Sequence, residues 1–234
     1  MSASAVTVLQ IVNKIMARLR EDSLGALSDT DYARTVLQLL NDAKREVEDA
    51  FNWSALRNTI DVDTVQSTST YSISDGSSVY TNQRSRLVEV YNSTTDHYLI
   101  QIPRDRMRRL RYDDDQEAEP MYYSIDGYDS DQNIQIEIHP NPDAVYTLKC
   151  VAFIPQEDFT VSASGGSSIT VPWRPVYLRT LSLVLRERGD DEGISFGEAF
   201  QDYVVSLNDA IAYEQRAVYD NSLDGDWHVV TNGF

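Results

Sequence analysis

Residues 171–189, VPWRPVYLRTLSLVLRERG, decide the fold, because they return the chain to a helical pattern after a long strand-like region. Pro172 ends that region, and Pro175 suits the first turn of a helix, where the missing N–H group costs no hydrogen bond. Leucine and valine then recur at helical spacing as far as Gly189, which we expect to cap the C-terminus. The sequence therefore predicts a helical domain that starts before the strand-like region and is completed after it.

Three other segments carry apolar residues at the i, i+3, i+4, i+7 spacing of an amphipathic helix. They cover residues 5–19, 28–53 and 196–214. The second begins with Ser28 and Asp31 in a capping-box-like pattern. Neither pair of helices can close a core alone, so we expect the two hairpins to form one four-helix bundle. That bundle would consist of residues 1–57 and 172–218.

The intervening residues 58–171 carry strand-like alternation and turn residues instead. The cleanest alternation places Ile134, Ile136 and Ile138 on one face of a strand. The other candidate strands cover residues 59–64, 69–73, 87–91, 97–102, 120–125, 145–154 and 169–171. Short strands at this spacing predict an antiparallel β-sandwich or barrel, inserted into the helical domain. The expected fold class is therefore α+β.

The last residues, 219–234, interrupt the helical pattern with Asn221, Asp224 and Gly225. They then become aromatic and β-branched, and the candidate anchors for a partner are Trp227, His228, Val229, Val230 and Phe234. One hypothesis is an extended C-terminal arm that adds a strand or an anchor to another chain. The alternative is a segment that folds back on its own domain or stays disordered.

The net charge of the chain limits the kinds of partner that it can bind. A formal net charge of −17 disfavours a protein whose main task is to grip phosphates. The charge fits either solubility or a surface past which DNA slides without sticking. No apolar run approaches the roughly 20 residues that a membrane-spanning helix needs, so we expect no membrane partner. The single cysteine, Cys150, lies in a strand-like stretch and favours a reducing compartment.

The sequence contains no complete catalytic or metal-binding pattern. None of the three histidines, His97, His139 and His228, has a second histidine or a cysteine at metal-ligand spacing. No phosphate-binding glycine loop and no nucleophile elbow occurs. Carboxylate pairs are abundant only because the chain is so acidic. We expect no catalytic residue, no metal and no cofactor, and a carboxylate-dependent hydrolase is the remaining enzymatic alternative.

The segment from Asp126 to Asn133 resembles a calcium-binding loop in its spacing of aspartates. An EF-hand that starts at Asp129 requires glycine at its sixth position and glutamate at its twelfth. This chain has Ile134 and Pro140 there. A hairpin turn is therefore the better interpretation.

A cluster of arginines stands beside a run of acids: Arg104, Arg106, Arg108, Arg109 and Arg111 precede Asp113, Asp114 and Asp115. One hypothesis is a solvated loop between strands. Another is a subunit contact, in which a positive patch meets the negative patch of a neighbouring copy head to tail and closes a ring. Nucleic-acid binding ranks last, because the acidic run opposes it.

The order of these parts resembles the head-to-tail adaptor proteins of tailed bacteriophages, the group that includes the tail tubular protein A of short-tailed phages. The segments that carry the resemblance are LLNDAKREVEDAFNWSALRN (39–58), STYSIS (69–74), RLVEVYN (86–92) and residues 171–189. They occur in the same order along nearly the whole chain, although no single motif is diagnostic.

The resemblance implies a structural protein of the virion, made in the host cytoplasm. It implies a ring, commonly of twelve copies, that binds the portal protein on one face and the tail nozzle or tube protein on the other. DNA leaves the head through the lumen without specific binding, and the C-terminal arm, residues 219–234, contacts the portal. A tail-completion or tail-tube-end structural protein is the alternative function.

Overall fold

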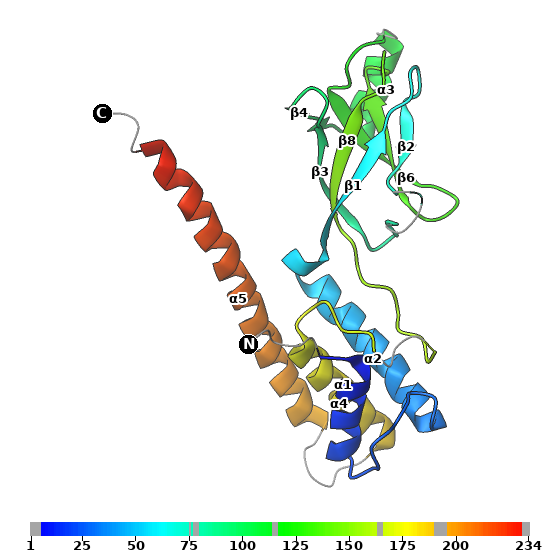
Figure 1. Cartoon of the computed structure of the whole chain (residues 1–234), viewed down its shortest axis with the longest axis vertical. Coiled ribbons are helices and arrows are strands. Elements are labelled where there is room, and N and C mark those ends of the chain that lie inside the picture. Colours follow the sequence, from blue (N-terminus) through cyan, green and yellow to red (C-terminus); the bar gives the residue numbers. More distant parts are fainter. Residues whose placement is uncertain are drawn as a thin grey trace. The chain divides into compact units, whose positions relative to one another are not determined.

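The computed structural model describes residues 6–74, 76, 80–113, 117–162, 166–189 and 196–230, without the side chains of residues 113 and 217–230. The chain forms two compact units: unit 1 comprises Met1–Ala55 and Gln156–Phe234, and unit 2 comprises Leu56–Pro155. Unit 1 is helical and unit 2 is built mainly from strands (Figure 1). The α+β class that the sequence predicts is confirmed.

The described helices of unit 1 are α1 (Val8–Arg18), α2 (Asp31–Ala50), α4 (Trp173–Arg188) and α5 (Phe196–Val230). Thr7 and Gln10 form a reciprocal capping box at the start of α1. α2 is capped by Thr30, whose side chain accepts a hydrogen bond from the Ala33 N–H at 3.0 Å, and not by Ser28. α4 ends at Gly189, which adopts the left-handed conformation with φ of 61°, as the sequence predicts.

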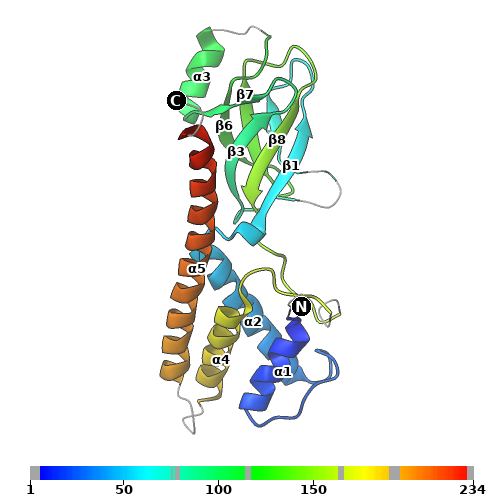
Figure 2. The ribbon, with the colours of Figure 1, turned by 60° about the vertical axis from the view of Figure 1, so that its left-hand side comes forward.

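α4 is the central helix of unit 1, and it contacts α1, α2 and α5 (Figure 2). Thr180 and Ser182 point in directions about 200° apart around the helix, yet both are fully buried. A helix buried on nearly every side needs no amphipathic pattern. The regular four-helix bundle that the sequence predicts, with one core shared by two hairpins, is therefore not confirmed.

Unit 2 contains two four-stranded sheets with the orders β1-β8-β3-β4 and β2-β7-β6-β5. The strands are β1 (Arg57–Asp63), β2 (Thr70–Ser72), β3 (Arg86–Asn92), β4 (His97–Tyr98), β5 (Ile100–Gln101), β6 (Tyr122–Tyr128), β7 (Ile134–His139) and β8 (Thr147–Phe153). All pairs are antiparallel except β5 with β6. The unit also holds helix α3 (Arg104–Asp113), and the short helix η1 (Ser54–Leu56) leads into β1.

Both sheets contribute side chains to a single hydrophobic core. Ile134, Ile136 and Ile138 of β7 are all buried there, so their predicted alternation is confirmed. Ile60 of β1 and Leu148 of β8 pack into the same cluster from the other sheet. No barrel closure is seen, because each described sheet keeps two edge strands.

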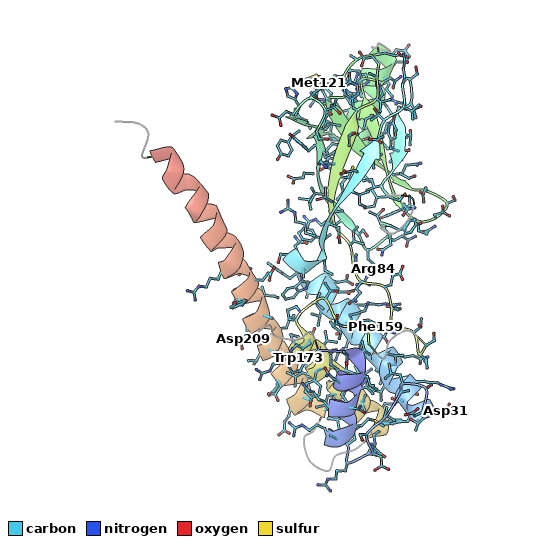
Figure 3. The ribbon with its side chains drawn as sticks, viewed as in Figure 1. Asp31, Arg84, Met121, Phe159, Trp173 and Asp209 are labelled. Carbon is cyan, nitrogen blue, oxygen red and sulfur yellow. The ribbon has the colours of Figure 1, made fainter. Side chains whose placement is uncertain are left out.

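The residues that join β8 to α4 pack on α2, within unit 1. We call residues 156–162 and 166–172 the return segment. Asn41 of α2 donates to the Phe159 carbonyl at 3.0 Å and accepts from the Phe159 N–H at 2.9 Å. Phe159 is labelled in Figure 3. The sequence analysis placed this segment in the β-rich insertion. No strand forms at the predicted residues 169–171, and the preceding residue, Ser168, makes an isolated bridge to Thr7.

The extended arm predicted for residues 219–234 is wrong where the structure describes it, because α5 continues as a helix to Val230. A glycine inside a helix costs only about 1 kcal/mol relative to alanine, and asparagine or aspartate costs less. Continuing an existing helix also needs no new nucleation. Asn221, Asp224 and Gly225 are therefore too weak to end it, and residues 231–234 lie outside the described part of the chain.

Candidate interaction surfaces

Helix α3 carries the arginine cluster, so the hypothesis of a solvated loop is wrong for these residues. The Pro103 carbonyl accepts from the N–H groups of Arg106 and Met107 at 3.0 and 3.1 Å, which closes the first turn. Met107 is fully buried and fixes the helix to unit 2. One buried side chain among so many arginines is a weak helical signal, which explains why the sequence pattern did not predict this helix.

Two of the five arginines are paired with the second sheet. Arg104 forms an ion pair with Asp126 of β6. Arg111 forms one with Glu137 of β7, at 2.8 Å, and its guanidinium also lies 3.4 Å from the side-chain oxygen of Asn141. Both arginines therefore hold α3 in place and are not part of a free surface.

Arg106, Arg108 and Arg109 are exposed, and within the described residues no ion pair joins them to an acidic group. Arg108, Arg109 and Tyr112 lie at the i, i+1, i+4 positions of one helix side, opposite Met107. Tyr112 is 93% exposed. We call Arg108, Arg109 and Tyr112 the arginine face.

The structure describes only part of the acidic run that follows the arginines. Asp113 ends α3, but its side chain is not described, and Asp114 and Asp115 lie outside the described residues. Their role in a subunit contact therefore stays a prediction.

Helix α5 packs on α4. Ala199 and Tyr203 are the most buried of its described side chains. Arg179 of α4 forms an ion pair with Glu46 at 2.5 Å, and its guanidinium lies 5.7 Å from the centre of the Tyr203 ring. Phe200, three residues before Tyr203 on the same helix, remains 39% exposed.

A second exposed surface follows one side of α5. Asp202, Val205, Asp209 and Tyr213 are spaced i, i+3, i+7 and i+11, so they lie along one line of the helix. All four are exposed, Val205 by 61% and Tyr213 by 77% (Asp209 is labelled in Figure 3). We call these four residues the α5 stripe. The sequence pattern did not predict this stripe, because it does not show which side of the helix α4 covers.

The predicted anchors Trp227, His228, Val229 and Val230 lie in the last turns of α5, and their side chains are not described. Phe234 lies outside the described residues. Over its first half α5 runs beside α4, and it then continues past the ends of the other helices of unit 1 (Figures 1 and 2). A role for these anchors in partner binding stays a prediction.

In the aspartate loop that resembles a calcium site, the Asp129 carboxylate accepts hydrogen bonds from the protein itself. Asp129 accepts from the backbone N–H groups of Asp131 and Asn133 at 2.9 and 2.8 Å. Hydrogen bonds from Ser72 and from Asn133 lower the pKa of the Asp129 carboxyl. In the part of the chain that the structure describes, no group of three or more histidines, cysteines, aspartates or glutamates could hold a metal ion.

The remaining chemistry-bearing groups are dispersed or buried. Burial raises the pKa of the Cys150 thiol to about 12. His97 lies 3.5 Å from Glu119 on an exposed strand, and His139 is buried at the end of β7. An open depression of about 510 Å³ lies beside α1, and Lys14 is the charged side chain among the described residues that line it. The Lys14 ammonium lies 3.9 Å from the centre of the Trp173 ring. None of the described helices is both long and apolar enough to cross a membrane.

A family model described as SU10 adaptor protein matches residues 6–225 of the chain. The matched region covers all of unit 2 and most of unit 1, and it reaches into α5. No curated protein matches the chain.

Proposed function

Since the chain belongs to the SU10 adaptor protein family, a family of phage head–tail adaptors, we propose that it forms a ring that joins the portal to the tail. The family match over residues 6–225 is the observation that carries this proposal. As a phage adaptor the protein is a structural component of the virion. The finer features, a ring of twelve copies and a tail nozzle or tube on its other face, belong to the proposal.

The charge distribution supports ring formation through unlike surfaces. The chain is strongly acidic, yet α3 presents three exposed arginines with no partner among the described residues. An unpaired basic surface on an acidic protein is the complement of that protein's own surface. Contact between two different surfaces of identical copies is heterologous and closes into a ring when the rotation permits.

The net charge also supports a DNA conduit. Twelve copies at −17 each carry a formal charge of about −200. If much of this charge faces the lumen, it repels phosphates, so DNA passes without binding. This proposal needs no base-reading surface and no enzymatic site.

We place the portal contact at the C-terminal end, on Trp227, His228, Val229, Val230 and Phe234. Because α5 continues as a helix to Val230, the contact we propose is a helix seated in a groove rather than an added strand. The continuation of α5 past the other helices of unit 1 supports a role outside that unit (Figure 1).

We also propose that unit 2 is an inserted domain and that the helical parts before and after it form one domain. The backbone N–H of Ile154 donates to the Leu56 carbonyl at 2.9 Å, so the chain enters and leaves unit 2 at the same place. An insertion with adjacent ends leaves its host domain undisturbed.

Native mass spectrometry of the purified protein with its portal tests the proposed function. We expect a complex with one ring of the protein, at twelve copies, on each portal. Binding of only one or two copies, or binding to the tail tube without the portal, would refute the adaptor role. The latter result would favour the tail-tube-end alternative.

A further inference from the structure

We propose that the arginine face of α3 in one copy docks on the α5 stripe of the next copy. This inference rests on the proposed ring and names the two surfaces that meet in it. Both surfaces are described, exposed and different from each other, as a head-to-tail contact requires.

The arginine face has the composition of an interface centre. Tyr112 is 93% exposed and is flanked one turn earlier by Arg108 and Arg109. Tyrosine and arginine are enriched among the residues that dominate binding energy in protein interfaces. A tyrosine this exposed gains the burial of nearly its whole ring when a partner covers it.

The α5 stripe offers complementary groups along one line of the helix. Asp202 and Asp209 lie seven residues apart, which is about 10.5 Å along a helix. Val205 lies between them and is 61% exposed, and Tyr213 continues the line. Within the described residues no ion pair joins Asp202 or Asp209 to a base. Two carboxylates are thus free for arginines, and Val205 is free to pack against Tyr112.

The occupant of each surface follows from this charge complementarity. Exposed ion pairs alone contribute little to stability, so a contact also needs apolar burial at its centre. The α5 stripe supplies a valine and a tyrosine beside its carboxylates, whereas the acidic run at Asp113–Asp115 supplies only charges. For this reason we assign the arginine face to the α5 stripe of a second copy.

Charge exchange tests the assignment. Arg108→Glu with Arg109→Glu, and separately Asp202→Arg with Asp209→Arg, should each weaken ring assembly on the portal about tenfold. Combining all four substitutions in one chain restores opposite charges across the contact and should return assembly to near the wild-type level. The matched control is Arg18→Glu with Arg20→Glu, which changes the net charge equally at two exposed arginines outside α3.

Native mass spectrometry with the portal is the readout, after circular dichroism has shown that each variant is folded. If the arginine variant assembles as well as the control, the assignment is wrong. It is also wrong if both double variants fail and the fourfold variant does not recover. A wild-type protein that forms no ring on the portal would instead refute the proposed function itself.

Disulfide trapping separates a contact between copies from one within a chain. Tyr112→Cys and Val205→Cys are made in two differently tagged proteins, which are mixed with portal and oxidised. The only native cysteine, Cys150, is buried and does not compete. We expect a covalent pair that carries both tags. Absence of that pair on assembled rings would overturn the assignment, as would an efficient crosslink inside a single chain that carries both substitutions.

Discussion

Replacing Lys44 with methionine should destabilise unit 1 by about 3–5 kcal/mol, the range observed when one partner of a buried ion pair is removed. The Lys44 and Glu48 side chains are both fully buried, with 3.5 Å between the ammonium nitrogen and a carboxylate oxygen. Lys44 also donates to the carbonyls of Gln156 and Glu157, the latter at 2.8 Å. The substitution removes this ammonium from the buried Glu48 carboxylate, which still accepts from the Gln156 N–H at 3.2 Å.

The double variant Lys44→Met with Glu48→Met should recover most of this loss and end within about 2 kcal/mol of the wild type. It removes both charges, and apolar replacement of a buried pair is often close to neutral. What remains lost is the hydrogen bonding of the return segment, whose carbonyls are partly accessible to water. The matched control is Arg45→Met. Arg45 pairs with Asp158 but is 48% exposed, so we expect a loss of at most about 1 kcal/mol.

Urea unfolding followed by tryptophan fluorescence measures these effects. All three tryptophans, Trp53, Trp173 and Trp227, belong to unit 1, so the signal reports that unit separately from unit 2. Trp53 is buried and donates to the Val47 carbonyl at 2.7 Å, which makes its emission sensitive to unfolding. A loss of less than about 1 kcal/mol for the Lys44 single variant would show that water reaches the pair and would refute the argument from burial. A double variant no more stable than the single would refute the coupling between the two charges.

Three further predictions concern other parts of the chain. The fragment Leu56–Pro155 should fold alone and give a cooperative transition by circular dichroism, because the strands at its two ends pair with each other; a non-cooperative loss of signal would contradict this. Cys150 should resist a thiol reagent at pH 8 in the folded protein and react after unfolding, because burial raises its pKa to about 12; rapid reaction in the folded state would show that the core opens. Asp129→Ala should destabilise this fragment above about pH 5, and the difference from the wild type should shrink as the pH falls through the lowered pKa of Asp129. A difference that does not depend on pH would show that the loop needs the shape of Asp129 and not its charge.

Where the sequence predicted correctly, the signal was local. Pro175, the recurring leucines and Gly189 define α4 through backbone rules that depend on a few neighbouring residues. The alternation of the isoleucines in β7 likewise reflects one strand and one core. Such patterns can be recognised in the sequence without knowing how the rest of the chain folds.

Helix α3 could not be predicted, because its support comes from distant residues. Arg104 and Arg111 are paired with Asp126 and Glu137, which follow later in the sequence on other elements. Without those partners, a segment with five arginines and a single buried Met107 carries the pattern of a solvated loop. Tertiary pairing decided the structure here, and single-sequence periodicity does not record it.

The end of α5 was predicted wrongly for a different reason. The sequence analysis treated Asn221, Asp224 and Gly225 as a stop, although each residue disfavours a helix only weakly. The two candidate surfaces also differ in how much of each the sequence alone could predict. The arginines were found from charge alone, whereas the α5 stripe required knowing which side of the helix α4 covers.

The central position of α4 has a consequence for the order of events during synthesis. The apolar faces of α1 and α2 are translated first, but their cover, α4, follows only after the roughly 100 residues of unit 2, so at about 5–20 residues per second the ribosome takes about 5–20 s to supply it. Unit 2 draws its core from residues of its own span and can be complete by then. The apolar faces of α1 and α2 stay uncovered during this time and must not aggregate. The many charged residues on the outer side of α2 help to keep it soluble until α4 is made. The part of the chain that is made first is thus the part that finishes folding last.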